Sequence, residues 1–237
     1  MDQTTIVKEK VELAVADGTR MAAYVARPQK MGPHPGLLLF QEAFGVNHHI
    51  RSVSDRFAAE GYVVIAPELF HRTAPAGYEA GYTDFPSVMP HLQAVTTETA
   101  GADINSAYDW LHSNDAVKAS EISSVGFCMG GRVSFIANST VLLRAAVSYY
   151  GGGIAPALLD RASRLQAPSL LIWGGLDKHI TPEHRRAVTE ALSAEKKIYV
   201  NAEFSRADHG FFCDERAAYE PHSARQAWAL TLEFLRS

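Results

Sequence analysis

Short apolar runs recur along the chain, and segments of helical periodicity separate them. The runs lie at 36–40, 62–66, 122–127, 145–149, 169–173 and 197–200. A continuous apolar run bounded by turn residues is typical of a strand buried on both faces of a sheet. These segments therefore predict a set of buried, mostly parallel strands.

Helical spacing of apolar residues, at i, i+3, i+4 and i+7, recurs at 50–58, 104–111, 188–192 and 227–235. Strands that alternate with helices predict an α/β fold with a mostly parallel central sheet and helices on both faces. Two alternating runs around Asp17-Gly18 predict an N-terminal β-hairpin. The segment 73–90 contains Pro and Gly and is expected to be one long irregular loop, of the kind that often forms a lid or a binding loop.

The composition limits the kind of protein. The chain has 237 residues, 47% hydrophobic and 20% charged, which is typical of a folded globular protein, and we expect a single α/β-hydrolase domain over 1–237. The net charge of −4 is spread without a like-charge block, which argues against a nucleic-acid partner. No apolar run approaches the roughly 18 residues of a membrane span, and the N-terminus lacks a secretory pattern. We expect a cytoplasmic monomer without a membrane partner.

One motif carries recognisable chemistry. The run 122–127 leads into Gly126-Phe127-Cys128-Met129-Gly130 and then into an apolar helical stretch at 133–137. This is the pattern of a nucleophile elbow, with Cys in place of the more familiar Ser. The turn from strand to helix is tight enough to require residues without side chains at Gly126 and Gly130. The nucleophile stands at a helix N-terminus, whose dipole favours an anion, so we expect Cys128 to be a thiolate.

Two later loops supply partners for this thiol. The run 169–173 ends at Gly174-Gly175-Leu176-Asp177, and the run 197–200 is followed by Asp208-His209-Gly210. The chain order Cys128, Asp177, His209 is the nucleophile, acid, base order of the α/β-hydrolase fold. The sequence thus predicts a catalytic triad of these residues.

Each residue also has a plainer interpretation. Cys128 could be a buried thiol at a tight turn, Asp177 a turn or cap carboxylate before Thr181, and His209 a surface imidazole. Asp208 is a rival acid, but adjacent side chains seldom face one another. Cys213 lacks an elbow and is interpreted as a passive thiol. No spacing typical of a zinc site or of a nucleotide-binding glycine loop is present, so no metal or organic cofactor is expected.

Five stretches resemble the dienelactone hydrolase family, and they span most of the chain in family order. They are 41–51, 61–70, 126–132, 149–153 and 208–211. The pairing of Glu-x-x-Gly-x-Asn, beginning at Glu42, with Gly-x-Cys-x-Gly-Gly is the specific part of the likeness. The resemblance implies the α/β-hydrolase fold, with Cys128 as nucleophile, His209 as base and Asp177 as its partner.

The resemblance also implies roles outside the triad. In the family, a glutamate at the position of Glu42 lies near the thiol and helps to control its ionisation. The backbone N–H groups of Ala43 and Met129 are expected to form the oxyanion hole. Cys213 stands where the family carries an arginine that binds a substrate carboxylate. Arg72 is the candidate for that role here, although neither it nor Arg206 aligns with a family position, which puts the carboxylated dienelactone in doubt.

The function expected from these residues is hydrolysis of a lactone or small ester through a thioester intermediate. The alternative is a ligand-binding protein that keeps the fold without catalysis. Such a protein would not need Cys128, Asp177, His209 and Glu42 together. A His209 that titrates near the reference pKa of about 6.5 would make activity rise through about pH 6–7.

Overall fold

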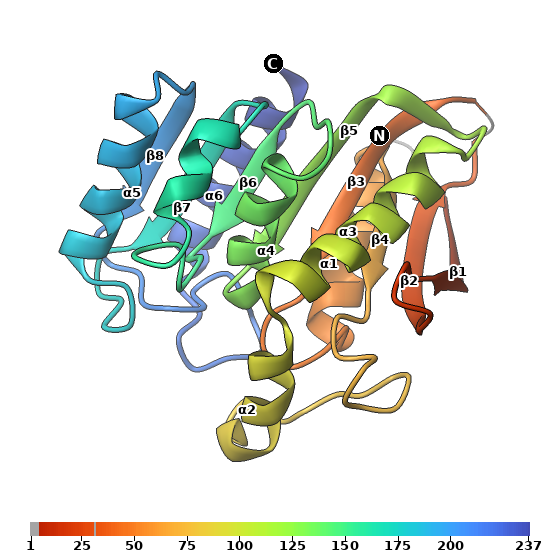
Figure 1. The fold of residues 1–237 in the computed structure, drawn as a ribbon, viewed down its shortest axis with the longest axis horizontal. Coiled ribbons are helices and arrows are strands. Elements are labelled where there is room, and N and C mark those ends of the chain that lie inside the picture. Colours follow the sequence, from red (N-terminus) through yellow and green to blue (C-terminus); the bar gives the residue numbers. More distant parts are fainter. Residues whose placement is uncertain (1–4, 31) are drawn as a thin grey trace. The chain divides into compact units, whose positions relative to one another are not determined.

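The structure is a computed structural model that describes residues 5–30 and 32–237. It contains two compact units, one up to Ser123 and one from Ser124 to Ser237. The prediction of a single domain over 1–237 stays a prediction. The α-helices and strands of both units are labelled in Figure 1.

The first unit contains four complete strands, three helices and the first part of a fifth strand. Its elements are β1 (Ile6–Ala14), β2 (Arg20–Pro28), β3 (His34–Phe40), α1 (His48–Ala59), β4 (Val63–Pro67), α2 (Phe85–Ala94), α3 (Thr97–His112) and β5 (Val117–Phe127), the last of which continues into the second unit. Strands β1 and β2 pair antiparallel, which confirms the predicted hairpin, whereas β3 and β4 pair parallel. The strand order here is β1-β2-β4-β3-β5.

The second unit begins within β5 and alternates strands with helices. Its further elements are α4 (Met129–Asn138), β6 (Ala146–Tyr149), the 3-10 helix η1 (Leu159–Arg164), β7 (Ser169–Gly174), α5 (Pro182–Ala194), β8 (Tyr199–Phe204) and α6 (Pro221–Arg236). Strands β5, β6, β7 and β8 lie in that order, and all neighbours are parallel. The predicted α/β fold with mostly parallel strands is therefore confirmed.

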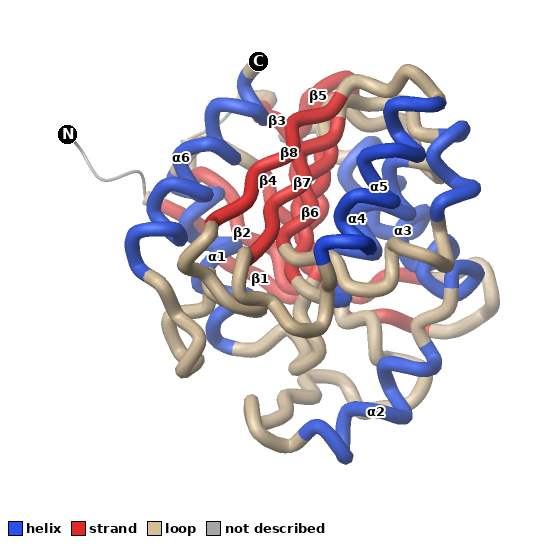
Figure 2. The backbone as a smooth tube through the Cα atoms, turned by 90° about the vertical axis from the view of Figure 1, so that its left-hand side faces the viewer, coloured by secondary structure: helices blue, strands red, loops and turns tan. Residues whose placement is uncertain are grey.

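In each unit the helices lie on both faces of the strands (Figure 2). In the second unit, α4 and α5 cover one face and α6 the other; in the first, α1 and α3 lie on opposite faces. The apolar runs before β8 form the core, and Leu37, Val64 and Leu170 are fully buried. The run 197–200 is the exception: Ile198 is 73% and Val200 41% exposed, because β8 stands last in the strand order and is not covered on both faces. Because parallel strands end at the same edge of a sheet, the loops after β5, β7 and β8 meet at one edge of the second unit.

The long loop expected at 73–90 is wrong in its last third, from residue 85 onward. Helix α2 begins at Phe85, and the side chain of Asp84 accepts a hydrogen bond from the backbone N–H of Ser87. Pro86 lies in the first turn, where its missing N–H costs nothing, but Pro90 stands inside the helix. With two prolines in ten residues, the segment does not resemble a helix in the sequence. Packing of Val88 against Phe44 stabilises the helix despite these prolines.

Among the described residues, no helix has both the length and the apolar character needed to cross a bilayer.

Candidate active site

Cys128 lies at a strained turn between β5 and α4. Its backbone has φ 55° and ψ −117°, a left-handed conformation that is rare for a residue with a side chain. A Cβ on Gly126 would lie 1.9 Å from the carbonyl oxygen of Gly130, so only glycine fits there. The backbone N–H of Cys128 donates to the carbonyl oxygen of Tyr149 at 3.0 Å, which ties the turn to the end of β6. This is the geometry expected of a nucleophile elbow.

The loops after β7 and β8 bring an acid and an imidazole to this thiol. The distance from Cys128 Sγ to His209 Nε2 is 3.1 Å, and that from His209 Nδ1 to Asp177 Oδ2 is 2.8 Å. The other oxygen of Asp177 accepts hydrogen bonds from the backbone N–H groups of His179 and Ile180, at 2.8 and 3.1 Å. The three residues predicted from chain order thus form one hydrogen-bonded relay.

The rival acid is excluded by its geometry. Asp208 uses its Oδ1 to accept a hydrogen bond from the backbone N–H of His209 at 2.7 Å, and its side chain is exposed. It does not contact the imidazole of His209, which pairs with Asp177 instead. The plainer interpretation of Asp177 as a turn carboxylate describes only one of its oxygens. Oδ1 accepts the backbone hydrogen bonds of its own loop, whereas Oδ2 pairs with His209.

The electrostatics of the relay favour an ion pair. Burial opposes the charged imidazole, but the negative charge of Cys128 and the hydrogen bond to Asp177 outweigh it and raise the pKa of His209 to about 10. Burial likewise opposes the charge on Asp177, yet its bonds to His209, His179 and Ile180 leave the pKa of that carboxyl lowered. The assumption that His209 titrates near 6.5 is therefore wrong, because the sequence cannot show which charges surround it.

Close contact between loops fixes the relay in place. A Cβ on Gly174 would lie 2.6 Å from the carbonyl oxygen of Ala207, and one on Gly175 would lie 2.6 Å from the Cα of Ser205. The loop that carries Asp177 therefore touches the loop that carries His209, backbone to backbone. The Gly-Gly pair before Asp177 was the sequence signal for this contact.

Three residues of the second unit lie near the relay but were not assigned a role from the sequence. The rings of Tyr150 and His179 lie 5.1 and 5.4 Å from the ring of His209, centroid to centroid. Arg132, one turn after Cys128, is a further positive charge: burial lowers the pKa of its guanidinium, and the charge of Cys128 acts against that shift. The stretch 149–153 resembles the family, but aromatic residues in an α/β core carry no spacing signal, so the sequence gives Tyr150 no role of its own.

The remaining predicted residues lie at the starts of two segments. Met129 is the first residue of α4, and its backbone N–H has no acceptor within the helix. Glu42 and Ala43, in the first unit, lie just after β3, separated from it by Gln41, and their exposed fractions are 1% and 2%. Glu42 is thus a buried carboxylate and not a solvated loop residue.

Arg72 has a structural function in the first unit. Its Nη1 and Nη2 donate to the two carboxylate oxygens of Asp103 at 2.9 and 2.8 Å, and its Nε donates to Asp17 at 2.7 Å. A guanidinium held by two carboxylates of its own chain is poorly suited to bind a substrate carboxylate. We therefore leave Arg72 out of the proposed site; its partner Asp103 is 31 residues away in the chain, which hid the pair from sequence reasoning.

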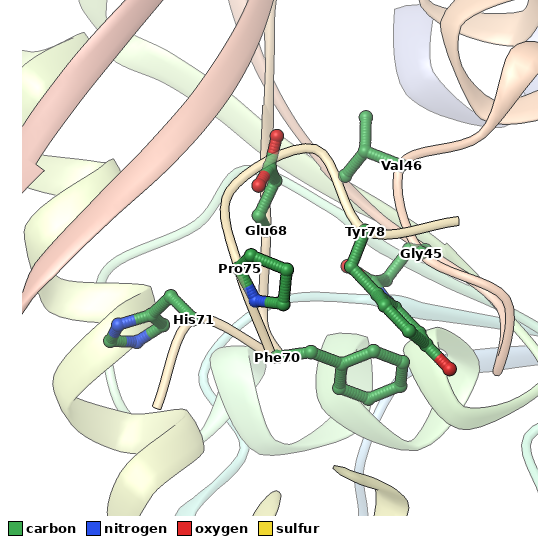
Figure 3. Close-up of a pocket in the computed structure, with 8 residues that line it drawn as sticks. Gly45, Val46, Glu68, Phe70, His71, Pro75 and Tyr78 are labelled. Carbon is green, nitrogen blue, oxygen red and sulfur yellow. The ribbon is translucent and has the colours of Figure 1, made fainter. Parts of the chain in front are cut away.

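A cavity beside the segment that carries Glu42 is too small for a substrate. Its volume is about 10 Å³, room for about one water molecule. Figure 3 shows its lining, which comes from Gly45 and Val46 and from the segment 68–78, where the rings of Phe70 and Tyr78 lie side by side. It is a packing void of the first unit.

Comparison with known proteins identifies the family. The model of the "Dienelactone hydrolase family" matches residues 21–237. A protein of Synechocystis named "Putative carboxymethylenebutenolidase" is 34% identical over 220 residues, which cover 88% of each chain. A protein of the same name from Escherichia coli O157:H7 is 35% identical over 231 residues, 93% of this chain and 84% of that one.

A solved structure agrees with these sequence matches. The crystal structure named "Putative Dienelactone Hydrolase from Klebsiella pneumoniae" superposes with a TM-score of 0.90 at 31% identity, and the match covers 98% of this chain and 99% of the other. The elbow, the nucleophile, acid, base order and the parallel strands of the second unit are what this fold requires. The chain therefore belongs to the dienelactone hydrolase family of α/β-fold hydrolases.

Proposed function

We propose that this ester-bond hydrolase cleaves a lactone or small ester with Cys128 as its nucleophile, through a thioester intermediate. The observation that carries the proposal is the continuous relay from Cys128 Sγ through the His209 imidazole to Asp177, at 3.1 and 2.8 Å. A nucleophile, a base and a residue that orients the base are the minimum for covalent catalysis of acyl transfer.

The first half of the reaction opens the ester. The Cys128 thiolate attacks the carbonyl carbon, and a C–S bond forms as the carbonyl oxygen becomes an oxyanion. The C–O bond of the ester then breaks, and the His209 imidazolium transfers its Nε2 proton to the leaving oxygen. A lactone opens to a thioester with a free hydroxyl group, and His209 is left neutral.

The second half regenerates the enzyme. Neutral His209 accepts a proton from water at Nε2, and the hydroxide formed attacks the thioester carbonyl. The C–S bond breaks, the acid product leaves, and the thiolate faces the imidazolium again. Asp177 holds the proton on Nδ1 throughout, so that Nε2 is the nitrogen that exchanges protons.

Two further groups complete the proposal. The backbone N–H of Met129, at the start of α4, would donate to the oxyanion, and the family pattern assigns the second donor to Ala43; such donors are typically worth about 2.7–4 kcal/mol each in the transition state. Glu42 is proposed to influence the ionisation of the thiol. Glu42 is buried, so its carboxylate is partly desolvated and its own proton affinity is sensitive to what enters the site.

The substrate class is proposed from the names of relatives and from the site. A carboxymethylenebutenolidase acts, by its name, on a butenolide, which is a lactone. The arginine that could have held a substrate carboxylate, Arg72, is paired with Asp103 and Asp17. We therefore propose lactones and small esters as a class, without a required carboxylate.

The test is a panel of lactones and short aryl esters, run on the wild type, Cys128→Ala and Cys213→Ala. We expect the wild type and Cys213→Ala to hydrolyse part of the panel, and Cys128→Ala to lose at least about 10⁴-fold in kcat/KM. Mass spectrometry should find the acyl group on Cys128 after rapid quenching.

Two results would overturn the proposal. Equal activity of Cys128→Ala and the wild type would assign hydrolysis to another nucleophile. No hydrolysis of the panel, together with stoichiometric binding of an unchanged lactone, would favour a ligand-binding protein that keeps the fold.

A further inference from the structure

Tyr150 has a backbone conformation that few aromatic residues adopt. Its φ is +36°, in the left-handed region, where a bulky side chain is strained. It directly follows β6, and its N–H donates to the carbonyl oxygen of Ile172 on β7 at 2.7 Å. The preceding residue, Tyr149, accepts the hydrogen bond of the Cys128 N–H. The strain thus lies next to the elbow, where such strain is often functional.

The side chain of Tyr150 is fully buried and contacts both loops of the relay. Its ring centroid lies 6.3 Å from that of Phe127, the residue before the nucleophile, and 5.6 Å from that of Phe211, two residues after His209. Its centroid lies 5.1 Å from that of the His209 imidazole, at an interplanar angle of 57°. One ring therefore touches the strand end before Cys128, the loop after His209, and the imidazole itself.

This contact restrains a motion that hydrogen bonds leave open. His209 is held at Nδ1 by Asp177 and at Nε2 by Cys128. Two hydrogen bonds at opposite sides of a ring resist its translation but permit it to tilt about the line that joins them. A ring packed against the imidazole opposes that tilt. The ring of His179 also contacts His209, at 5.4 Å and 78°, but His179 is exposed and can move.

We propose that Tyr150 is a positioning residue, whose buried ring holds the imidazole of His209 so that Nε2 stays directed at Cys128 Sγ. The proposal rests on the proposed function for its catalytic consequence. It gives the strained backbone a purpose, because the left-handed turn after β6 directs this side chain toward the imidazole. A misdirected base is costly, since displacement of a reacting group by about 1 Å can cost 10²-fold in rate.

The test compares variants that keep or remove the ring. Tyr150→Leu and Tyr150→Met remove it, and Tyr150→Phe keeps it and lacks only the hydroxyl. Phe57→Leu is the matched control, because Phe57 is a fully buried aromatic residue of the first unit with no role in the relay. Each variant is measured for kcat and KM, for the rate and pH dependence of Cys128 alkylation by iodoacetamide, and for unfolding by urea.

We expect Tyr150→Leu and Tyr150→Met to lose about tenfold in kcat with little change in KM, and to show an altered pH dependence of alkylation. Tyr150→Phe should recover most of that loss. Phe57→Leu should lose stability and keep the wild-type pH dependence. If Leu fails to fold, Met fills the volume with a flexible chain and decides the matter.

The proposal is overturned if the folded Leu or Met variant keeps the wild-type kcat and alkylation profile, because Tyr150 would then contribute only stability. It is also overturned if Tyr150→Phe is as impaired as Leu, which would shift the role to the hydroxyl. The alkylation profile needs no substrate. It therefore still reports on Tyr150 if hydrolysis proves independent of Cys128, an outcome that would overturn only the proposed function.

Discussion

Each unit of the molecule contains a histidine paired with a buried aspartate, and the two pairs differ in their chemistry. In the first unit, His71 Nε2 lies 3.1 Å from Asp103 Oδ1, and in the second, His209 Nδ1 lies 2.8 Å from Asp177 Oδ2. Asp103 also binds both terminal nitrogens of Arg72. Asp177 binds no cation other than His209 in the described structure.

The two pairs differ in what lies beside the second ring nitrogen of each histidine. Nδ1 of His71 is buried and has no hydrogen-bond partner among the described residues, whereas Nε2 of His209 lies 3.1 Å from a thiol. The carboxylate of Asp103 is divided between two side chains, so the group serves to hold α3 to the segment after β4. A histidine and aspartate pair is therefore not a site by itself. The third group makes the difference.

Replacing each acid by its amide should separate the two pairs most strongly. Asp177→Asn should lower kcat/KM by about 10³–10⁴-fold, because the amide favours the wrong imidazole tautomer. Asp103→Asn should keep activity and lower the free energy of unfolding by about 3 kcal/mol, because Arg72 loses its buried partner. Steady-state kinetics and urea unfolding measure both effects. A large loss of activity in a folded Asp103→Asn variant would contradict the conclusion that the His71 and Asp103 pair is structural only.

Exchange of the nucleophile should have the next largest effect. Cys128→Ser should fold with unchanged far-UV circular dichroism and lose about 10²-fold or more in kcat/KM, because a hydroxyl must be deprotonated during attack while a thiol can be held ionised. Near wild-type turnover of the Ser variant would mean that the site is not matched to a thiol.

Glu42→Gln tests whether the buried carboxylate of the first unit influences the reaction, and its expected effect is smaller. It should lower kcat/KM by about tenfold, the equivalent of one pKa unit in the ionisation of an interacting group. The matched control is Glu79→Gln, an exposed carboxylate paired with Arg51 at 2.6 Å, which should change neither activity nor stability. Equal kinetics for both variants would remove Glu42 from the site.

The pH dependence should be slight across the neutral range. Because His209 has a pKa of about 10 in the folded protein, it stays protonated at pH 7–9, and kcat/KM should change by less than about twofold there before it falls near pH 10. The same pKa exceeds the unfolded value of about 6.5, so this charge contributes full stability below about pH 6.5 and loses it as the pH rises through 10. His209→Gln should lack that alkaline loss of stability. A rise in activity through pH 6–7 would contradict this prediction and indicate that His209 titrates near its ordinary pKa of about 6.5.

The sequence indicated those features that depend on local spacing. Gly126 before Cys128, the turn at Asp17-Gly18 and the apolar strands before β8 each follow from rules of a few residues, and the structure agrees with them. The chain order of Cys128, Asp177 and His209 sufficed to bring the triad together because the loops after parallel strands meet at one edge.

Features that depend on contacts between distant residues could not be predicted. Arg72 looked available because Asp103 is remote in sequence, and α2 looked irregular because Pro86 and Pro90 conceal its packing against Phe44. The charge of His209 depends on how deeply the ring is buried and on which anions surround it. Tyr150 lies in the family-like stretch 149–153, but that likeness gives it no role, and its backbone angle and its ring contacts are what distinguish it from other core aromatics.

At Cys128, the left-handed turn that presents the thiol also lowers the stability of the folded protein, because a residue with a side chain is strained there. Glycine adopts φ 55° and ψ −117° without strain, whereas any side chain there is held in place by the rest of the fold. Cys128→Gly should therefore give an inactive protein that is more stable by about 1 kcal/mol, partly offset by the greater freedom of glycine in the unfolded chain. Stability alone would favour glycine at this position, so the presence of Cys128 is what the proposed role of its thiol would explain.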